Sequence, residues 1–350
     1  MFVAPHHPTG RSVWMGKDLV QSTNWAYQLP GKALDDIRQS LGHLTGRNPY
    51  VENVTKAEFP LASMARELDE LREELAYGRG FVVIKGLPSE EFTNLELGLI
   101  FRGFSAHFGN DLAQSFYGDH LGDIRDISDL IIDRNKRRGY HSGGFQTAHT
   151  DPGGALDIVG MLSLRKALRG GESLIASAHT VHNFLQEWCP ELLEEFYTGF
   201  VLRRPDPDAA ALGKPPLLGC VPSFVFQDNW LNCDFQEGYM RRAQENGDSH
   251  ISVKQRAALG AFTSISNHPD VILKMMLEPG DFQYINNRKI LHGRAQFEDS
   301  EIRAERRHLY RIWLNVPDWP GTPSHQGTLW LDDIKRWEEH ARVNQLTVPA

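Results

Sequence analysis

Cysteine is scarce in this sequence, which has three among 350 residues: Cys189, Cys220 and Cys233. They are far apart and form no CxxC pair, a pattern that excludes a disulfide framework and a thiolate zinc site. The chain also has no run of about 18 apolar residues, the length that a membrane-spanning helix needs. Its first residues lack the basic and apolar regions of a signal peptide. We therefore expect a soluble, cytoplasmic protein that does not bind a membrane.

Several catalytic motifs are missing as well. The sequence contains no GxxxxGK[ST] phosphate loop, no GxGxxG, no GxSxG and no HExxH. Nucleotide-dependent, hydride-transfer, serine-hydrolase and zincin activities therefore lose their main support. The formal net charge of −8 argues against a nucleic-acid-binding surface, because phosphate backbones are bound by basic patches. A small molecule is the expected partner, and the sequence leaves a homo-oligomer open.

The hydrophobic pattern changes near Ile124. Before it, apolar residues recur at steps of three and four between Leu61 and Leu75, which predicts an amphipathic helix, and "GFVVIKGLP" predicts a buried strand. After it, short apolar runs such as "DIVGMLSLRK", "DFQYINN" and "HLYRIWLNV" are separated by Gly, Pro, Asn and Asp. This spacing predicts a mainly β fold with flanking helices, either an antiparallel barrel or a jelly roll. Because no repeat or long linker divides the chain, we expect a single domain.

His149 and Asp151 lie two residues apart in "QTAHTDPGGALD". Alternate residues of a strand project to the same face, so both side chains would point together into the fold. A nitrogen and an oxygen donor at this spacing suit two positions of a non-haem iron(II) site, which needs one further imidazole. The pair alone is a weak signal, and the alternative is a turn in which Asp151 bonds the backbone before Pro152.

The best third ligand is His292 in "ILHGR". It precedes a strand, "RRHLYRIWLNV", whose alternate residues share one face: Arg307, Leu309, Arg311 and Trp313. If that face is buried, the two guanidinium groups need anionic partners, and a guanidinium fork matches the carboxylate of a dicarboxylate cosubstrate. The alternative is a solvated outer face, which is the commoner place for arginine.

Together "HTD", "GGES", "ILHGR" and "RRHLYR", in this order, resemble the taurine dioxygenase-like (TauD/TfdA) family of iron(II)- and 2-oxoglutarate-dependent oxygenases. The resemblance spans about residues 80–317. It implies a double-stranded β-helix, a jelly roll of cupin-like type, with iron held by three residues: His149, Asp151 and His292. It also implies that Arg307 and Ser173 bind the distal carboxylate of 2-oxoglutarate.

The resemblance defines other positions less closely. Arg311 takes the place of an arginine that contacts substrate or the other end of the cosubstrate, and Arg303 and Arg306 compete with Arg307 for the distal carboxylate. In a regular strand, Phe145 would share the face of His149 and wall the substrate pocket; the alternative is a plain core aromatic. Residues 126–144 and 223–235 have the composition of pocket-rim segments.

The activity implied by the family is an oxidation that uses iron(II), 2-oxoglutarate and O2 and releases succinate and CO2. Halogenating members replace the metal-binding carboxylate by a small residue, so Asp151 indicates hydroxylation or a related two-electron oxidation. We expect a small, anionic or amino-acid-like substrate. A zinc-dependent hydrolase and a metal-binding jelly roll without oxygenase activity are the alternatives.

The expected domain covers residues 1–350 as one oxygenase unit. Residues 1–75 would form an N-terminal decoration, residues 80–317 the catalytic jelly roll, and residues 318–350 a C-terminal helix.

Overall fold

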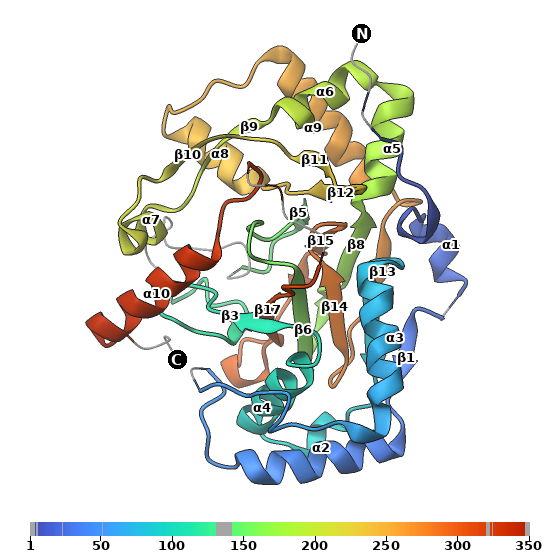
Figure 1. The fold of residues 1–350 in the computed structure, drawn as a ribbon, viewed down its shortest axis with the longest axis vertical. Helices are drawn as coiled ribbons and strands as arrows, with labels where there is room; N and C mark the ends of the chain where they lie inside the picture. The colour runs from blue at the N-terminus through green and yellow to red at the C-terminus, as the bar shows by residue number, and fades with distance from the viewer. Residues whose placement is uncertain are drawn as a thin grey trace.

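Two β-sheets carry the long strands of the protein, in a computed structural model that describes residues 4, 6–22, 24–50, 52–130, 142–319, 323 and 325–346 (Figure 1). The main sheet runs in the order β1 (Ala26–Gln28), β2 (Phe81–Lys85), β14 (Phe282–Asn286), β6 (Ile158–Arg165), β17 (His308–Asn315) and β3 (Asn110–Leu112), and β4 (Gly122–Ile124) also pairs with β17. The second sheet runs in the order β13 (Leu273–Met275), β8 (Ser173–Ser177), β15 (Ile290–Arg294) and β5 (Gln146–His149).

The mainly β class with flanking helices is confirmed, and one cavity lies between the two sheets. Met161 of β6 and Gln283 of β14 line it from the main sheet, and Ser173 of β8 and His292 of β15 line it from the second. Of the two forms that the sequence left open, the jelly roll is confirmed; the described residues do not form a closed barrel, because no strand pairing joins the edges of the second sheet to the main one. The cavity is therefore held between two separate sheets.

Successive side chains along β17 point alternately to the helix-covered face and to the cavity face of the main sheet. In β17, Tyr310, Ile312 and Leu314 pack in the hydrophobic cluster beneath the N-terminal helices. Leu309 and Trp313 pack in a second cluster on the other face. The period of two expected for "HLYRIWLNV" is confirmed, and it decides which side chains can reach the site.

Three helices cover the outer face of the main sheet (Figure 1): α2 (Gly31–Leu44), α3 (Ala65–Ala76) and α4 (Asn94–Ser105). The helix expected between Leu61 and Leu75 is α3 with a short 3-10 turn before it, and its apolar residues are buried. Each fully buried leucine of this kind contributes about 1.5–3 kcal/mol relative to an exposed one. Thr93 begins α4 with a capping box to Glu96, which satisfies backbone N–H groups of the first turn.

The N-terminal segment is part of the main sheet, which the sequence pattern did not indicate. β1 pairs in parallel with β2, with Ala26 opposite Val83. A strand of only three residues is too short to show an alternation, so its place depends on the backbone of β2 rather than on its own side chains.

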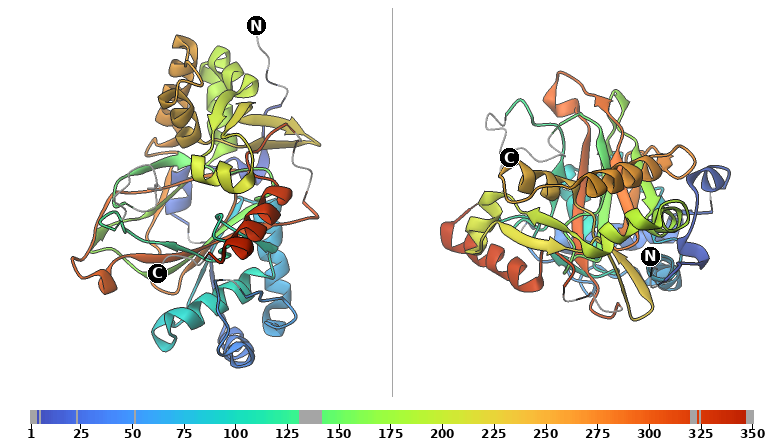
Figure 2. Two further views of the ribbon diagram at one scale, coloured as in Figure 1. Left: turned by 90° about the vertical axis from the view of Figure 1, so that its left-hand side faces the viewer. Right: turned by 90° about the horizontal axis from the view of Figure 1, so that it is seen from above.

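The second sheet is covered by α5 (Ala178–Trp188), α6 (Pro190–Thr198) and α9 (Val253–Ser266), as Figure 2 shows from two further sides. Pro190 starts α6, since proline fits the first turn of a helix but not its interior. Six short strands form three separate antiparallel pairs: β9 (Phe200–Arg203) with β10 (Leu217–Val221), β11 (Phe224–Gln227) with β12 (Trp230–Cys233), and β7 (Arg169–Gly170) with β16 (Phe297–Glu298).

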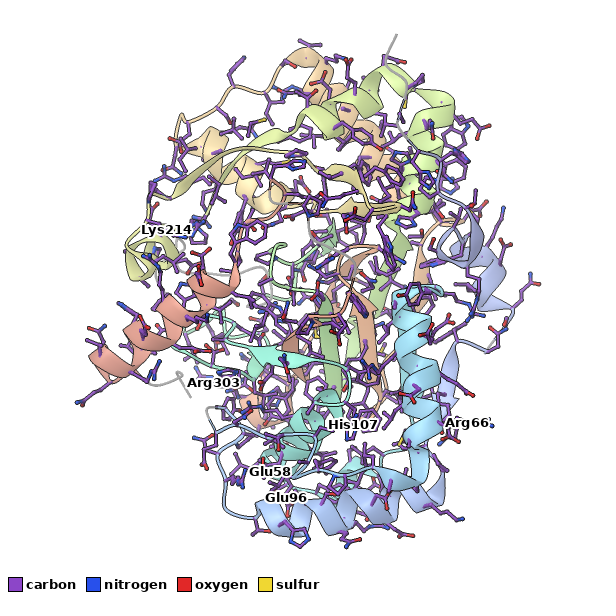
Figure 3. The ribbon with its side chains drawn as sticks, in the orientation of Figure 1. Glu58, Arg66, Glu96, His107, Lys214 and Arg303 are labelled. Carbon is purple, nitrogen blue, oxygen red and sulfur yellow. The ribbon has the colours of Figure 1, made fainter. Side chains whose placement is uncertain are left out.

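The C-terminal helix α10 (Leu331–Asn344) packs against α7 (Asp206–Leu212). Lys214, labelled in Figure 3 just after α7, forms an ion pair with the buried Asp333 of α10. The helices α1 (Gly16–Val20) and α8 (Glu237–Glu245) complete the set. None of the described helices combines the length and the apolar character needed to cross a lipid bilayer.

Candidate active site

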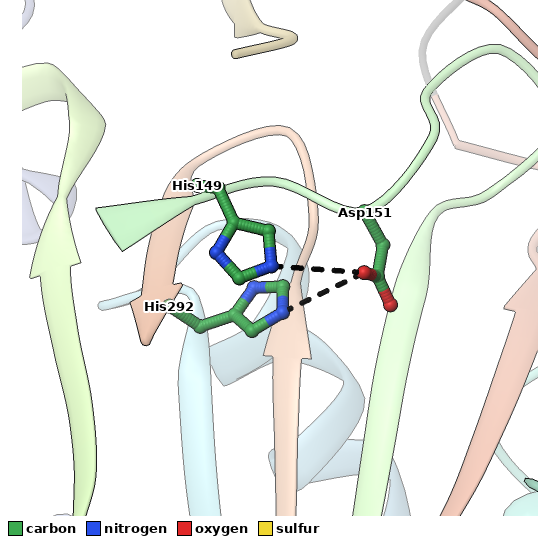
Figure 4. A group of neighbouring side chains, drawn as sticks. All are labelled: His149, Asp151 and His292. Atoms are coloured by element: carbon green, nitrogen blue, oxygen red, sulfur yellow. Dashed lines mark ion pairs between the residues drawn. The ribbon is translucent and has the colours of Figure 1, made fainter. Parts of the chain in front are cut away.

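Three side chains meet where β5 and β15 pair. His292 lies directly opposite His149 in the ladder, and Asp151 follows two residues later. Asp151 Oδ1 is 4.0 Å from His149 Nε2 and 3.8 Å from His292 Nε2 (Figure 4). One ligand atom from each of the three residues lies within 4.8 Å of the other two.

This donor set fits a metal ion. Ligand atoms that each lie about 2.0–2.2 Å from one ion are at most about 4.4 Å apart, so small side-chain rotations bring all three into range. Two imidazoles and one carboxylate on one side of an ion leave its other positions open, as in non-haem iron(II) oxygenases.

Backbone contacts orient two of these groups. His149 Nδ1 lies 2.8 Å from the carbonyl oxygen of Thr147, which assigns the proton to Nδ1 and makes Nε2 the nitrogen with a lone pair for a metal. Asn287 holds the backbone of Asp151 from both sides: its Oδ1 accepts from the Asp151 N–H at 2.9 Å, and its Nδ2 donates to the Asp151 carbonyl at 3.0 Å. In this way Asp151 is fixed although it lies beyond the end of β5.

The second carboxylate oxygen of Asp151 is already engaged by protein groups. Its Oδ2 accepts hydrogen bonds from Trp313 Nε1 at 2.7 Å and from Arg311 Nη1 at 3.2 Å. Arg311 is itself held by Gln114, whose Oε1 accepts from Arg311 Nε at 2.8 Å. Because Oδ2 is occupied, Oδ1 is the oxygen that faces the two histidines.

The protonation states of the site suit metal binding. Burial alone would raise the pKa of Asp151, but Arg311 and the two histidines outweigh it and hold the pKa below its ordinary value. Burial, followed by the charge of His149, lowers the pKa of His292 to about 3. An ionised carboxylate and a neutral imidazole are the forms that bind a metal, so little proton release is needed at neutral pH. His292 Nδ1 is buried and has no hydrogen-bond partner among the described residues.

The far end of the cavity holds Arg307 and Ser173. Arg307 is 7% exposed, its Nη2 donates to the carbonyl of Gly171 at 3.3 Å, and burial lowers its pKa to about 10. Its Nη1 is buried without a hydrogen-bond partner in the described part of the chain. The Ser173 hydroxyl donates to Gln283 Oε1 at 2.9 Å.

The two competing arginines lie outside the cavity lining. Arg303, labelled in Figure 3, is exposed and bonds Asp129 through Nε and Nη2. Arg306 bonds the same carboxylate through Nη1 and Nη2. Of the three arginines, Arg307 is the one that lines the cavity.

The expectation that Phe145 walls the pocket was wrong. Phe145 is 54% exposed and does not line the cavity. The reason is a bulge in β5: two steps along β15, from His292 to Arg294, correspond to three along β5, from His149 to Gln146. A bulge breaks the alternation of side chains, so Gln146 takes the place beside His149, with its Nε2 3.4 Å from His149 Nε2.

Two segments, residues 126–144 and 223–235, were expected to form the rim of the pocket. Residues 223–235 form a hairpin whose Phe224, Leu231 and Phe235 pack in the cluster under α5, α6 and α9, and none of their side chains lines the cavity. Of the other expected rim segment, residues 131–141 lie outside the described residues.

Sequence reasoning missed four polar residues around the site: Gln114, Gln146, Asn287 and Arg294. A signal existed for Arg294, because it stands two residues after His292 in a strand and must share its face. Gln114 lies 197 positions from Arg311, so no local pattern joins the two.

Comparison with known proteins adds a family and a set of similar folds. The family model described as "Taurine catabolism dioxygenase TauD, TfdA family" matches residues 46–313. The FR-33289 synthase of Streptomyces rubellomurinus is 28% identical over 328 residues, which cover 91% of this chain and 94% of that protein. The taurine hydroxylase-like protein SAT17 of Stachybotrys chartarum is 26% identical, over 87% of this chain and 86% of that protein.

Solved structures share the architecture at low identity. An asparagine oxygenase in complex with Fe(II), 2S,3S-3-hydroxyasparagine and succinate matches with a TM-score of 0.65 and 15% identity, over 83% of this chain and 94% of that chain. The non-heme iron oxygenase OrfP in complex with Fe and alpha-ketoglutaric acid matches with a TM-score of 0.61 and 18% identity, over 83% and 94% of the two chains. At these identities the likeness concerns the fold.

Proposed function

Because the chain belongs to the TauD, TfdA family, and is therefore a non-haem iron(II)- and 2-oxoglutarate-dependent dioxygenase, we propose that it oxidises a small, anionic or amino-acid-like molecule at His149, Asp151 and His292. The observation that carries the proposal is the meeting of the three ligand atoms at a cavity that also holds Arg307. We further propose that one oxygenase unit makes up the chain, with its catalytic part at residues 80–317.

The three ligands have distinct tasks in this proposal. His292 presents a neutral imidazole, His149 offers Nε2, and Asp151 offers Oδ1 while its Oδ2 stays with Trp313 and Arg311. Bound iron(II), with 2-oxoglutarate and O2, supplies the two-electron oxidising power, and succinate and CO2 are the expected co-products. The protein contributes position, charge and the exclusion of water.

Arg307 and Ser173 hold the distal carboxylate of 2-oxoglutarate in this proposal. The unpartnered, buried Nη1 of Arg307 supports it, since a buried N–H without a partner costs free energy that an anionic ligand relieves. Arg311 has Asp151 and Gln114 as protein partners, so we assign it to the positioning of Asp151 and not to a direct grip on substrate.

The substrate class rests on solved structures of similar fold, because the arginines that line the cavity are assigned here to the cosubstrate and to Asp151. Two of these structures have amino-acid-derived ligands: the asparagine oxygenase with 3-hydroxyasparagine, and OrfP with (3S)-hydroxy-L-Arg. We therefore place amino acids and small organic acids first among candidate substrates.

Anaerobic titration with iron(II) and 2-oxoglutarate tests the proposal. Chelation of the metal by the cosubstrate should give a visible absorption band in the wild-type protein and none in His149→Gln. The variant His43→Gln, at an exposed position of α2, should keep the band. After admission of O2, a panel of amino acids, sulfonates and phosphonates should then be read by succinate formation.

The alternatives make different predictions in the same assay. A metal-binding protein without oxygenase activity would show the band but no succinate with any substrate. A zinc-dependent hydrolase would retain zinc through purification and show neither band nor succinate, and that result would overturn the proposal.

A further inference from the structure

Arg294 is a second buried arginine beside Arg307 at the same end of the cavity. The two residues are 4% and 7% exposed, and both line the cavity. Both guanidinium groups lie against the ring of Phe297, at 4.6 and 5.3 Å from its centroid. Like charges this close repel each other in a poorly solvated site unless an anion lies near both.

The nitrogen atoms of Arg294 divide into two sets. Its Nη2 donates to the backbone carbonyls of Ser142 and Gly144, at 2.6 Å each, and these bonds fix the plane of the group. Its Nε and Nη1 are buried and have no hydrogen-bond partner in the part of the chain that the structure describes, and Arg307 Nη1 is in the same state. Three nitrogen atoms at one end of the cavity, Nε and Nη1 of Arg294 and Nη1 of Arg307, can therefore donate hydrogen bonds to a bound ligand.

The strand register sets how far this cluster lies from the metal ligands. Arg294 follows His292 by two residues in β15 and shares its face, and Ser173 of β8 lies opposite Arg294. A strand rises about 3.3 Å per residue, so Arg294 and Ser173 lie about 6.6 Å along the sheet from His292. This is about the reach of a five-carbon dicarboxylate bound to the metal by its other end.

We infer that Arg294 binds the distal carboxylate of 2-oxoglutarate together with Arg307, so that two guanidinium groups share one carboxylate beside Ser173. The inference rests on the proposed function, because it needs 2-oxoglutarate in this cavity. It also gives the bonds from Arg294 to Ser142 and Gly144 a role: they tie the cosubstrate to the segment that leads into β5 and His149.

The test removes the carboxylate from the ligand as well as the arginine from the protein. Dissociation constants for 2-oxoglutarate and for 2-oxopentanoate, which has a methyl group in place of the distal carboxylate, are measured anaerobically with iron(II) by the absorption band. Variants Arg294→Gln and Arg294→Lys are compared with wild type. Arg303→Gln, which removes an arginine outside the cavity, is the matched control.

Loss of a hydrogen bond to a charged group corresponds to roughly a tenfold to hundredfold weaker binding. We expect Arg294→Gln to weaken 2-oxoglutarate by that factor and to leave 2-oxopentanoate within about twofold of wild type. Arg294→Lys should fall between the two, because it keeps the charge and loses the fork. The control should bind both ligands as wild type does.

Two outcomes overturn the inference, and a third concerns the proposed function. If Arg294→Gln weakens both ligands equally, Arg294 only shapes the cavity through Ser142 and Gly144. If it weakens neither, it does not reach the cosubstrate. If the wild-type protein itself gives no band with 2-oxoglutarate, the proposed function fails. This result differs from a failure of the Arg294 inference, in which the wild-type protein gives the band and only the comparison with the variants disagrees. Unchanged iron(II) affinity and melting temperature in Arg294→Lys show that the variant is folded.

Discussion

The indole Nε1 of Trp313 donates a hydrogen bond to Asp151 Oδ2 at 2.7 Å. Together with the bond from Arg311 Nη1 at 3.2 Å, it turns one carboxylate oxygen away from the two histidines. Asp151 would therefore offer a metal a single oxygen, Oδ1. Trp313 does not line the cavity, so it acts on the proposed metal site through this carboxylate.

Replacing Trp313 by phenylalanine should weaken iron(II) binding by roughly tenfold to a hundredfold, the usual effect of losing a group that orients a metal ligand. The phenyl ring keeps most of the packing but cannot donate to Asp151. Competition with a chromophoric chelator under anaerobic conditions measures the change. Trp337→Phe, which removes a buried indole N–H that donates to the carbonyl of Asp208 at 3.4 Å, is the control. Equal iron affinity in wild type and Trp313→Phe would show that Trp313 does not orient Asp151.

Replacing Arg307 by alanine should raise the 2-oxoglutarate requirement about 30-fold or more while iron(II) binding survives. Loss of a buried, charge-assisted contact costs about 2–5 kcal/mol, at tenfold per 1.4 kcal/mol. Succinate formation against 2-oxoglutarate concentration gives the comparison. If succinate formation by Arg307→Ala depends on 2-oxoglutarate concentration as it does in wild type, another arginine binds the distal carboxylate.

Replacing Gly293 by alanine should separate the two histidine strands. A Cβ at this position would lie 2.5 Å from the backbone carbonyl oxygen of Gln146, so β5 must shift away from β15. Overpacking of this kind costs about 1–3 kcal/mol, and iron(II) affinity should fall with it. Chemical denaturation and iron titration of the same variant measure both effects. At Gly42 in α2 a Cβ meets nothing within 4 Å, so Gly42→Ala should keep both at wild-type values or slightly increase stability.

The stability of the metal-free protein should fall as pH drops from about 6.5 toward 3. Burial lowers the pKa of His179 to about 3 and that of His182 to about 4. Both histidines are neutral in the folded state and take up a proton on unfolding below their ordinary pKa, so acid favours the unfolded chain. Each can steepen the loss by up to about 1.4 kcal/mol per pH unit.

The variant His179→Asn tests the contribution of one of them. In the native protein His179 lies between Ser12 Oγ at 2.8 Å and the Leu231 carbonyl at 3.0 Å, and an asparagine amide offers an acceptor and a donor of the same kinds. Urea denaturation across this pH range should show a shallower loss in the variant. An unchanged slope would assign the acid sensitivity to other groups.

The parts of the site that follow a short period were predictable from sequence. Strand alternation predicts that Arg307, Leu309 and Arg311 share one face, and all three line the cavity. The mainly β class follows from the spacing of the apolar runs. Phe145 shows the limit of that method: alternation holds only while the register is regular, and the bulge between Gln146 and His149 cannot be seen in the letters.

The outer contacts of the site were not predictable, for a different reason. Asn287 is 136 positions from Asp151, and Gln114 is 197 from Arg311. Such pairs form only after the sheets have assembled, and a glutamine or asparagine gives no local indication of its partner. The fold class and the short motifs that carry the proposed ligands are therefore local properties of the sequence, whereas the orientation of Asp151 is a property of the assembled sheets.

The bulge in β5 also affects how such a site can diversify. It places Gln146 next to His149 without making it a member of the donor set, so position 146 borders the reaction space but has no required task in the proposed metal binding. Substitutions there can change the polarity beside the metal while all three ligands stay in place. A single codon change at position 146 can thus alter which substrate is preferred, while the three proposed metal ligands are kept.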